Sequence, residues 1–328
     1  MRWLITGGCG FIGANLAARL LKEDLTCRIR ILDNFSTGSS FNLHEACGKS
    51  ISGSRMELVQ ADARDPRACI ENSEGMDAIV HLAASAGVSQ SVDDPRRDME
   101  TNVISTFNML EAARQNCVKG FIFASSGAST GDTEPPVNEE KPPRPISPYG
   151  AGKLAGEGYC SAFFRTYGLK TVALRFGNVY GPYSGHKNSV VAKFFRQALS
   201  NQLLEVNGDG TQTRDFIYVH DITEAIILSI KGEVGGEVFQ IATCRETSIN
   251  ELVSKIKSLV ENETGNEVKI NYRSSLKGDM KRSFADISKA KKTLGFSPQY
   301  QLEEGLMKTF EYFKKESGRD YSRFLSWV

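Results

Sequence analysis

The feature that most constrains this 328-residue chain is a glycine-rich turn close to its start. An apolar run at residues 3–5 is followed by Gly7, Gly10 and Gly13, and an amphipathic stretch begins directly after the last glycine. Glycine permits a tight turn and a close approach of backbone to ligand, while the free N–H groups at a helix N-terminus attract phosphate. The strand-turn-helix context therefore predicts a phosphate-binding turn, although an ordinary structural turn could have the same glycines.

A carboxylate further along the chain helps to decide between these alternatives. Asp33 ends a second apolar run, at residues 28–32, where it can accept hydrogen bonds from the ribose hydroxyls of an adenosine. Asn34 follows it and no arginine comes before Arg55, so a 2′-phosphate would meet a negative charge without an evident cationic partner. Together the two features predict a dinucleotide site that takes NAD rather than NADP.

Short apolar runs alternate with longer amphipathic stretches through the first half of the chain. The runs at residues 3–5, 28–32, 78–82, 121–124 and 171–174 have the length and composition of buried strands. Strands separated by helices imply right-handed crossovers and a parallel sheet covered on both faces. We therefore predict an α/β fold with a doubly wound parallel Rossmann sheet and a smaller C-terminal α+β substrate lobe. The predicted ranges are 1–175 plus about 214–242 for the NAD-binding domain, and about 176–213 and 243–328 for the nucleotide-sugar lobe.

Composition argues against several other classes of protein. Forty basic and 39 acidic residues leave a formal charge of +1, so no net field attracts nucleic acid or a membrane surface. No run approaches the roughly 20 apolar residues of a membrane span, and the first residues lack a signal-peptide pattern. Seven scattered cysteines without a CxxC pair suggest neither a disulfide framework nor a metal site. We expect a cytoplasmic protein with reduced, packed cysteines and no metal.

A tyrosine and a lysine four residues apart carry the catalytic hypothesis. Tyr149 and Lys153 lie at the start of a predicted helix at residues 150–166, so both side chains can point into one site. A lysine ammonium and a positive nicotinamide would favour the phenolate, so Tyr149 could accept a hydroxyl proton during hydride transfer. Lys153 could also bind the nicotinamide ribose. Ser125 and Ser126, at the end of a preceding strand, could bind a substrate hydroxyl or relay its proton, or could simply form a turn.

With these residues in place, the chain resembles the extended short-chain dehydrogenases, and among them the NAD-dependent nucleotide-sugar epimerase and dehydratase family with a UDP-sugar 4-epimerase pattern. The resemblance covers nearly the whole chain. The matching segments are residues 6–13, 33–38, 61–65, 81–84, 101–102, 125–126, 149–153, 175–182, 214–219, 278–279 and 285–290.

The resemblance implies a role for each matching position. Counting back from Gly131 identifies the catalytic hydroxyl, and the implied catalytic residues are Ser126, Tyr149 and Lys153. The implied NAD-binding residues are Gly7, Gly10, Phe11, Ile12, Gly13, Asp33, Asn34, Ser36, Thr37, Gly38, Asp62, Ala63, Leu82, Ala83, Ala84, Asn102, Ser125, Tyr149 and Lys153. The implied substrate-binding residues are Ser85, Ser126, Tyr149, Asn178, Val190, Arg214, Arg273 and Asp279. Asp62 would bind the adenine amine, Asn178 the sugar and Arg214 the nucleotide end.

Departures from the family pattern indicate the reaction. Dehydratases of the family have Asp-Glu directly after the catalytic hydroxyl residue, and the decarboxylases keep the glutamate, whereas this chain has Gly127 and Ala128. The resemblance therefore favours reversible oxidation at the sugar C4, with the hydride returned to the opposite face of a 4-keto intermediate. Such an enzyme is an isomerase, a nucleotide-sugar 4-epimerase of carbohydrate metabolism and polysaccharide biosynthesis.

Two further departures affect the substrate pocket. Leu276 stands where many members have a diphosphate-binding arginine, and Arg273, Lys277 or Arg282 could replace it. Thr130 replaces an aromatic residue beside the sugar. We expect a UDP-linked sugar, while its C2 and C6 substituents stay open. A carboxylate at C6 would need a cation, and the candidates are Lys187, Lys193 and Arg196, unless these are simply solvated.

Other interpretations use the same residues. A redox-neutral epimerase would retain NAD as a tightly bound group, whereas a nucleotide-sugar oxidoreductase or 4-keto-sugar reductase would exchange it. A non-catalytic dinucleotide sensor would have no need of Tyr149 and Lys153. The resemblance also implies a homodimer through two predicted helices, at residues 98–116 and after Tyr149, that both have an apolar stripe. These stripes could instead simply cover the sheet.

Overall fold

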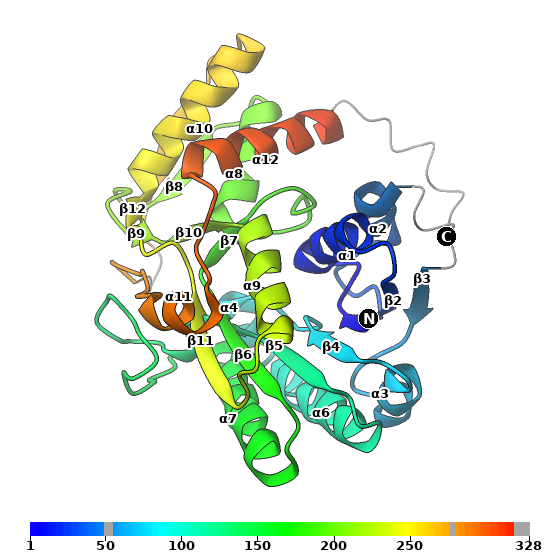
Figure 1. Cartoon of the computed structure of the whole chain (residues 1–328). Coiled ribbons are helices and arrows are strands. Elements are labelled where there is room, and N and C mark those ends of the chain that lie inside the picture. The colour runs from blue at the N-terminus through cyan, green and yellow to red at the C-terminus, as the bar shows by residue number, and fades with distance from the viewer. Residues whose placement is uncertain (49–54, 276–279, 318–328) are drawn as a thin grey trace.

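One large parallel sheet organises the molecule, which is a computed structural model describing residues 1–48, 55–275 and 280–317 (Figure 1). The seven strands lie in the order β11-β6-β5-β4-β1-β2-β3, and every pairing is parallel. Their bounds are β1 Arg2–Thr6, β2 Arg28–Asp33, β3 Met56–Gln60, β4 Ala78–His81, β5 Gly120–Ser126, β6 Thr171–Phe176 and β11 Glu237–Ile241. The predicted doubly wound sheet is confirmed.

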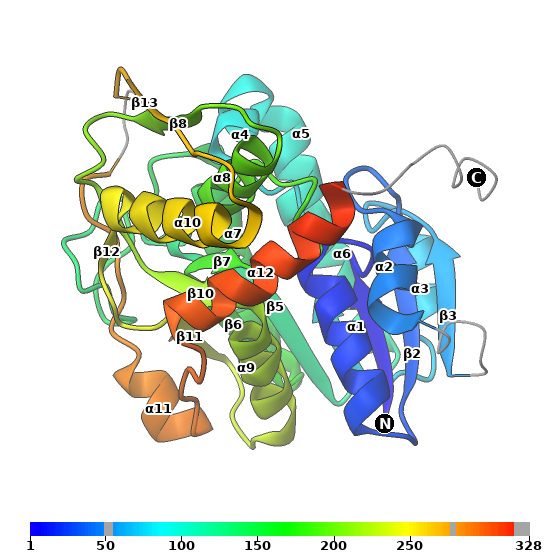
Figure 2. The ribbon, with the colours of Figure 1, turned by 90° about the horizontal axis from the view of Figure 1, so that it is seen from above.

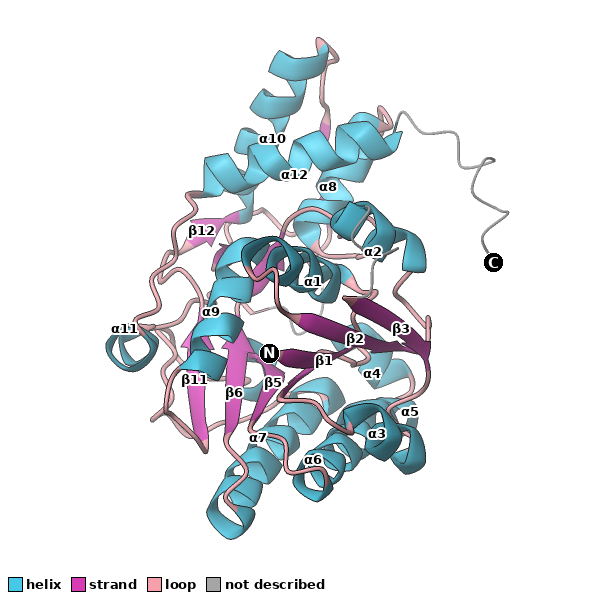
Figure 3. Ribbon diagram, turned by 45° about the vertical axis from the view of Figure 1, so that its right-hand side comes forward, coloured by secondary structure: helices cyan, strands magenta, loops and turns pink. Residues whose placement is uncertain are grey.

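Helices cover both faces of this sheet, as Figure 3 shows. Alternate side chains of β1 point to opposite sides, so Ile5 joins one hydrophobic cluster and Leu4 joins another. The helices packed in the first cluster are α1 Phe11–Glu23, α2 Ser40–Cys47, α9 Val219–Lys231 and α11 Ser288–Leu294. Those packed in the second cluster are α3 Pro66–Ser73, α6 Ser105–Gln115 and α7 Pro148–Tyr167. Central strands such as β4 and β6 are buried along their whole length because both of their faces are covered.

A smaller assembly of helices and two-stranded sheets packs around a third hydrophobic cluster (Figure 2). Phe11, at the start of α1, also belongs to this cluster and so ties the glycine turn to the smaller lobe. The helices of the lobe are α8 Val190–Leu199, α10 Ile249–Thr264 and α12 Leu302–Ser317. Its strands are β7 Asn178–Tyr180, β8 Leu204–Asn207, β9 Thr213–Arg214, β10 Phe216–Tyr218, β12 Thr247–Ser248 and β13 Ile270–Arg273.

The structure differs from the sequence prediction in several elements. Strands β3 and β11, at the two edges of the large sheet, were not identified. The predicted helix at residues 98–116 is divided into α5 Pro95–Met99, a π-helical segment Glu100–Ile104 and α6. Two other short helices, α4 Val88–Asp93 and the 3-10 turn Gly127–Ser129, border the site. Helix α11 packs against strand β11 of the large sheet and against helix α9, although the predicted domain boundaries assign it to the substrate lobe.

Three sequence expectations concern membranes, metals and cysteines. None of the helices in the described part of the chain is long and apolar enough to cross a membrane. The described residues hold no group of three or more histidine, cysteine, aspartate or glutamate side chains arranged to bind a metal. All seven cysteines are free thiols, and five of them are buried. Cys117 and Cys244 are exposed, so the expectation of packed cysteines is wrong for these two.

Candidate active site

The first cavity of the site lies where the strand order of the large sheet reverses. Strand β1 pairs with β2 on one side and β4 on the other, and open α/β sheets bind ligands beyond the carboxyl ends of strands at such a point. The cavity is lined by Gly7, Gly10, Phe11, Ile12, Gly13, Leu32, Asp33, Asn34, Ser36, Thr37, Gly38, Ala61, Asp62, Ala63, Arg64, Leu82, Ala83, Ala84, Ala86, Thr101, Ser105, Ala124, Ser125, Tyr149, Lys153, Phe176, His186 and Lys187. The structure thus gathers every predicted NAD residue except Asn102 around one space.

The glycine turn has a backbone that a side chain would obstruct. Gly7 has a φ of 67°, and a Cβ there would lie 2.8 Å from the backbone nitrogen of Ala83. A Cβ at Gly13 would lie 2.5 Å from the Cα of Gly8. Gly10 is the N-cap of α1 and offers no side-chain cap, so the first N–H groups of this helix have no side-chain acceptor there. The turn therefore fits a pyrophosphate, whose oxygens such N–H groups can bind.

Asp33 connects the end of β2 to the glycine turn. Its Oδ2 accepts a hydrogen bond of 2.9 Å from the Cys9 backbone N–H, and its Oδ1 accepts one of 2.8 Å from Phe35. Burial raises the pKa of this carboxyl, and the two backbone donors oppose that effect. Asp33 is therefore held rigidly beside the turn, at the position where a carboxylate can contact an adenosine ribose.

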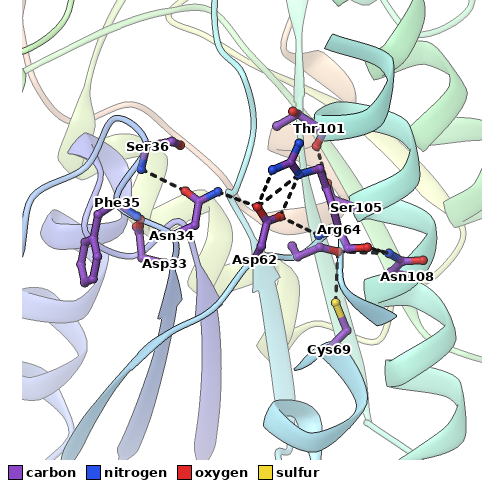
Figure 4. Close-up of polar contacts among 11 residues, drawn as sticks. Asp33, Asn34, Phe35, Ser36, Asp62, Arg64, Cys69, Thr101, Ser105 and Asn108 are labelled. Atoms are coloured by element: carbon purple, nitrogen blue, oxygen red, sulfur yellow. Dashed lines mark hydrogen bonds and ion pairs between the residues drawn. The ribbon is translucent and has the colours of Figure 1, made fainter. Parts of the chain in front are cut away.

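Asp62 lies beyond β3 in a network of polar contacts (Figure 4). Its Oδ2 accepts a bond of 2.7 Å from the Arg64 guanidinium and one of 3.0 Å from the Asn34 amide. The hydrogen bond with Arg64 is the main reason that the pKa of Asp62 falls to about 2. Asp62 therefore stays ionised at neutral pH and can accept a further hydrogen bond from a ligand, and Arg64 is occupied by this pair.

Asn102 braces a loop instead of lining the cavity. This side chain is 1% exposed, and it exchanges two hydrogen bonds with the backbone of Ser85, of 3.0 Å and 3.1 Å. It also donates to Asp98 Oδ1 at 2.8 Å. Ser85, predicted to touch the substrate, lines none of the cavities of the site, whereas Ala86 beside it does. The contribution of Asn102 is therefore to fix the loop that follows β4.

The predicted catalytic pair comes from the first turns of α7. The Nζ of Lys153 donates to the Ala124 carbonyl oxygen at 2.8 Å and lies 5.8 Å from the centroid of the Tyr149 ring. Burial lowers the pKa of Lys153 to about 8. Burial also raises the pKa of Tyr149, while a hydrogen bond with Ser126 lowers it. The protein alone therefore does not produce the low phenol pKa expected from the sequence, and the positive charge of NAD⁺ would have to supply the remainder.

Ser125 and Ser126 play different parts, although they are neighbours on β5. Ser125 is 3% exposed, and its hydroxyl donates to Glu157 Oε1 at 2.5 Å. Ser126 is half-buried, and its Oγ accepts a hydrogen bond of 3.1 Å from the Ala128 backbone N–H. Because Ser126 lies beside Tyr149 and its hydroxyl is not bound to Glu157, it is the better placed of the two to meet a substrate hydroxyl.

A buried ion pair supports the floor of the site. Arg175 on β6 and Glu157 on α7 are joined by bonds of 2.8 Å and 2.7 Å, and their side chains are about 5% exposed or less. Glu157 Oε1 also accepts a bond of 2.9 Å from Ser129. The pair therefore links β5, β6 and α7 beneath the catalytic residues. The motif Tyr-x-x-x-Lys does not predict this ion pair, because the ion pair depends on the pairing of β5 with β6.

A second cavity, of about 460 Å³, opens between the large sheet and the smaller lobe. Its lining includes the predicted substrate residues Ser126, Tyr149, Asn178, Val190 and Arg214. Arg214 donates to the carbonyl oxygens of Thr213 and Met280, which fixes its orientation. Arg273 does not line this cavity and instead forms an ion pair with Glu205, which does. Asp279, Leu276 and Lys277 lie outside the described residues.

A third cavity, of about 730 Å³, continues past Ser126 along the 3-10 turn. Gly127, Ala128 and Thr130 line it, so the positions that carry acids in the family dehydratases face this space without one. Asp215 supplies the only carboxylate among the residues described as its lining, and its oxygens accept bonds from Thr243 and from the backbone of Cys244. The described lining of this cavity therefore offers no acid without hydrogen-bond donors.

Sequence reasoning missed Asp98, one turn before Asn102. Its side chain is 2% exposed, and its Oδ2 has no hydrogen-bond partner among the described residues. Burial raises its pKa, and its charge acts on both Lys153 and Tyr149. The available signal was the spacing of four residues from Asn102, which places both side chains on one helical face.

The comparisons with known proteins agree with this geometry. Residues 3–242 match the family model described as the NAD dependent epimerase/dehydratase family. The chain is 37% identical to a UDP-glucose 4-epimerase of Mycolicibacterium smegmatis, over 97% of this chain and 100% of that protein.

Two solved structures are similar over most of their length. A UDP-N-acetylglucosamine 4-epimerase from Methanobrevibacter ruminantium has a TM-score of 0.88 and 32% identity, over 96% of this chain and 98% of that one. A UDP-glucuronic acid 4-epimerase from Bacillus cereus, in complex with UDP-glucuronic acid and NAD, has a TM-score of 0.85 and 30% identity, over 96% and 100%. With a matching model, a matching fold and an assembled Ser-Tyr-Lys site, the chain belongs to the NAD dependent epimerase/dehydratase family.

Proposed function

We propose that this protein inverts C4 of the hexose of a UDP-linked nucleotide sugar through a 4-keto intermediate, with NAD as cofactor. The observation that carries the proposal is that Tyr149 lines both the first cavity, which is surrounded by the predicted NAD residues, and the second cavity. Lys153 also lines the first cavity, and Ser126 also lines the second. The similarity to three proteins named as 4-epimerases of UDP-sugars supports the same activity.

The protein groups have complementary tasks in this reaction. Bound NAD supplies a reversible hydride acceptor. Lys153 would hold the nicotinamide ribose, and Tyr149 would take the proton of the C4 hydroxyl, directly or through Ser126. Tyr149 would return that proton to the oxygen on C4 when the ketone is reduced on the opposite face of the sugar. Asn178 and Val190 contact the substrate, with Arg214 toward the nucleotide.

The identities of Gly127 and Ala128, neither of which carries an acid, support epimerisation over two related reactions. Elimination of water from the 4-keto sugar needs an additional acid and base, and family decarboxylases keep a glutamate there. Among the described residues of the third cavity, Asp215 is the only carboxylate, and its oxygens are held by backbone and hydroxyl donors. The 4-keto intermediate therefore has one productive fate at this site, which is reduction.

We also propose that NAD stays bound between turnovers. Epimerisation consumes no net oxidant, and the glycine turn, Asp33, Asp62 and Lys153 give the cofactor anchors at both of its ends. An oxidoreductase with the same Tyr149 would need to release NADH. Retention of the cofactor during turnover therefore distinguishes the two activities.

Location and assembly are further proposals. Seven free thiols suit a reducing compartment, so we propose a cytoplasmic enzyme that supplies an epimerised sugar donor to polysaccharide biosynthesis. Helices α6 and α7 expose a cluster of large apolar side chains that supports a homodimer. The cluster contains Ile104 from the preceding π-helical segment, Phe107, Tyr159 and Tyr167.

A proton NMR time course tests the function. Purified protein without added NAD is incubated separately with UDP-glucose, UDP-N-acetylglucosamine and UDP-glucuronate. The proposal expects the galacto-configured product in at least one tube, while the protein retains its NAD. If the protein contains NAD and all three spectra stay unchanged, 4-epimerisation of these sugars is ruled out.

A further inference from the structure

The three cavities meet at a junction that holds one ammonium group besides the catalytic lysine. Four residues line all three cavities, namely Ala86, Tyr149, Phe176 and Lys187. Two of the four are apolar, and Tyr149 is the proposed base. Lys187, in the loop between β7 and α8, is therefore the one cation among the described residues that borders all three cavities.

The loop that carries Lys187 is fixed by specific contacts. The Lys187 backbone N–H donates to the Ser184 carbonyl oxygen at 2.9 Å, and Ser184 in turn donates to Gly181. The Arg196 guanidinium donates to the Gly185 and Lys187 carbonyl oxygens, both at 2.6 Å. Arg196 therefore serves the loop backbone and holds Lys187 at the junction.

Lys187 itself has no counter-ion in the described part of the protein. Lys193, another candidate cation of this pocket, is paired with Glu205 at 3.1 Å. No hydrogen bond or ion pair joins the Lys187 ammonium to a described residue, although the side chain is half-buried and burial lowers its pKa. A partly desolvated ammonium without an acid gains most from an anion supplied by the ligand.

The carboxylates around the three cavities are already engaged. Asp33 accepts from two backbone N–H groups, and Asp62 is paired with Arg64. Glu205 is paired with Lys193, and Asp215 accepts hydrogen bonds from the backbone N–H groups of Thr243 and Cys244. None of these acids forms an ion pair with Lys187, so its ammonium has no counter-ion among the described residues of these walls.

We propose that Lys187 binds an anionic substituent on the sugar ring, which makes nucleotide-linked uronic acids the preferred substrate class. A C6 carboxylate would form a charge-assisted hydrogen bond with the ammonium, which a neutral C6 hydroxyl cannot provide. The junction also borders Ser126 and Asn178, the proposed sugar contacts, while Arg214 serves the nucleotide end. This substrate class rests on the proposed function, since it assumes that a sugar lies beside Tyr149.

The test compares Lys187→Met and Lys187→Arg with the wild-type holoenzyme on UDP-glucuronate and UDP-glucose. A charge-assisted hydrogen bond is worth enough that we expect the KM for UDP-glucuronate to rise roughly 10- to 100-fold in Lys187→Met. The KM for UDP-glucose should change much less, and Lys187→Arg should keep the preference. Because the Lys187 charge also lowers the pKa of Lys153, any change in kcat should be the same for both sugars. Lys231→Met, at the exposed end of α9 and outside the three cavities, is the matched control.

Binding measured by calorimetry in parallel separates this inference from the function. Preferential binding of UDP-glucuronate that disappears in Lys187→Met supports the inference, whether or not the sugar is epimerised. An equal loss for both sugars, together with a fall in NAD content, would show that Lys187 serves the cofactor and would overturn it. Wild-type epimerisation of UDP-glucose without any preference for UDP-glucuronate would also overturn it, and would leave the proposed function standing.

Discussion

The pKa values of Tyr149 and Lys153 depend on effects that oppose one another. Burial and the Asp98 carboxylate raise its pKa, while the hydrogen bond with Ser126 lowers it. For Lys153, burial and the Lys187 charge lower the pKa, whereas Asp98 and Glu157 raise it. At the scale of a residue, a single substitution can therefore shift the pKa of either catalytic group.

Removal of the Tyr149 hydroxyl should abolish most of the turnover. General acid–base groups typically contribute about 10²- to 10⁴-fold to the rate, and we expect a loss of kcat in that range for Tyr149→Phe. The NAD content should stay near that of the wild type, because the glycine turn and Lys153 remain. Tyr167→Phe, at the exposed end of α7, is the control. A Tyr149→Phe enzyme that keeps most of its kcat would exclude Tyr149 as the base.

Neutralisation of Asp98 should shift the pH profile of kcat/KM to lower pH. A base acts when it is deprotonated, so activity rises with pH through the pKa of Tyr149, and the Asp98 charge raises that pKa. Asp98→Asn removes this charge and should move the rising limb toward acid. His81, also buried near Lys153, has its pKa lowered to about 3 and stays neutral over this range.

Asp94→Asn is the control for this experiment. Asp94 caps the same helix, α5, by accepting a hydrogen bond from the Arg97 backbone N–H, and asparagine can replace it as a cap. Superimposable pH profiles for wild type and Asp98→Asn would mean that the Asp98 charge does not reach Tyr149.

At the scale of the element, the buried ion pair joins a helix to two strands. Removing one partner of such a pair leaves an uncompensated charge, so Glu157→Ala should lower the free energy of unfolding by about 3–5 kcal/mol. The double variant Glu157→Leu with Arg175→Met removes both charges and should recover most of this loss. Denaturant unfolding of the three proteins checks the prediction, which fails if Glu157→Ala is as stable as the wild type.

Sequence patterns predicted the interior strands and missed those at the edges. Strands β4 and β6 are buried along their length, so they appear as continuous apolar runs. Edge strand β3 reads Met-Glu-Leu-Val-Gln and has no fully buried residue, so it lacks that signal. The π-helical segment before α6 was also missed, because its local sequence has the same periodicity as the helix around it.

The site was predictable where it follows from local chemistry. The glycine turn, Asp33 and the Tyr149–Lys153 pair each come from one continuous segment, and the structure brings them to one cavity. The environments of Lys187 and Asp98 arise from packing between segments distant in the chain. Their missing partners could therefore be recognised only once the fold was known.

At the scale of the whole molecule, the apolar cluster on α6 and α7 should hold two copies together. Phe107 is 38% exposed, and its ring lies 5.4 Å from that of Tyr159 across the two helices. Phe107→Glu places a charge in the cluster and should convert a dimer to a monomer in light scattering after size exclusion. Leu25→Glu, in a loop away from these helices, should leave the dimer intact. A wild-type monomer at micromolar concentration would contradict the proposed homodimer.

The most direct test of the proposed reaction follows the hydrogen on C4. A UDP-sugar substrate deuterated at C4 is converted by the enzyme in ordinary water without added NAD, and the product is examined by NMR and mass spectrometry. If the hydride leaves C4 and returns from the same retained cofactor, the epimerised product keeps its deuterium at C4. Loss of the deuterium to solvent, or conversion only when NAD is added in stoichiometric amount, would contradict C4 oxidation and return by a retained cofactor.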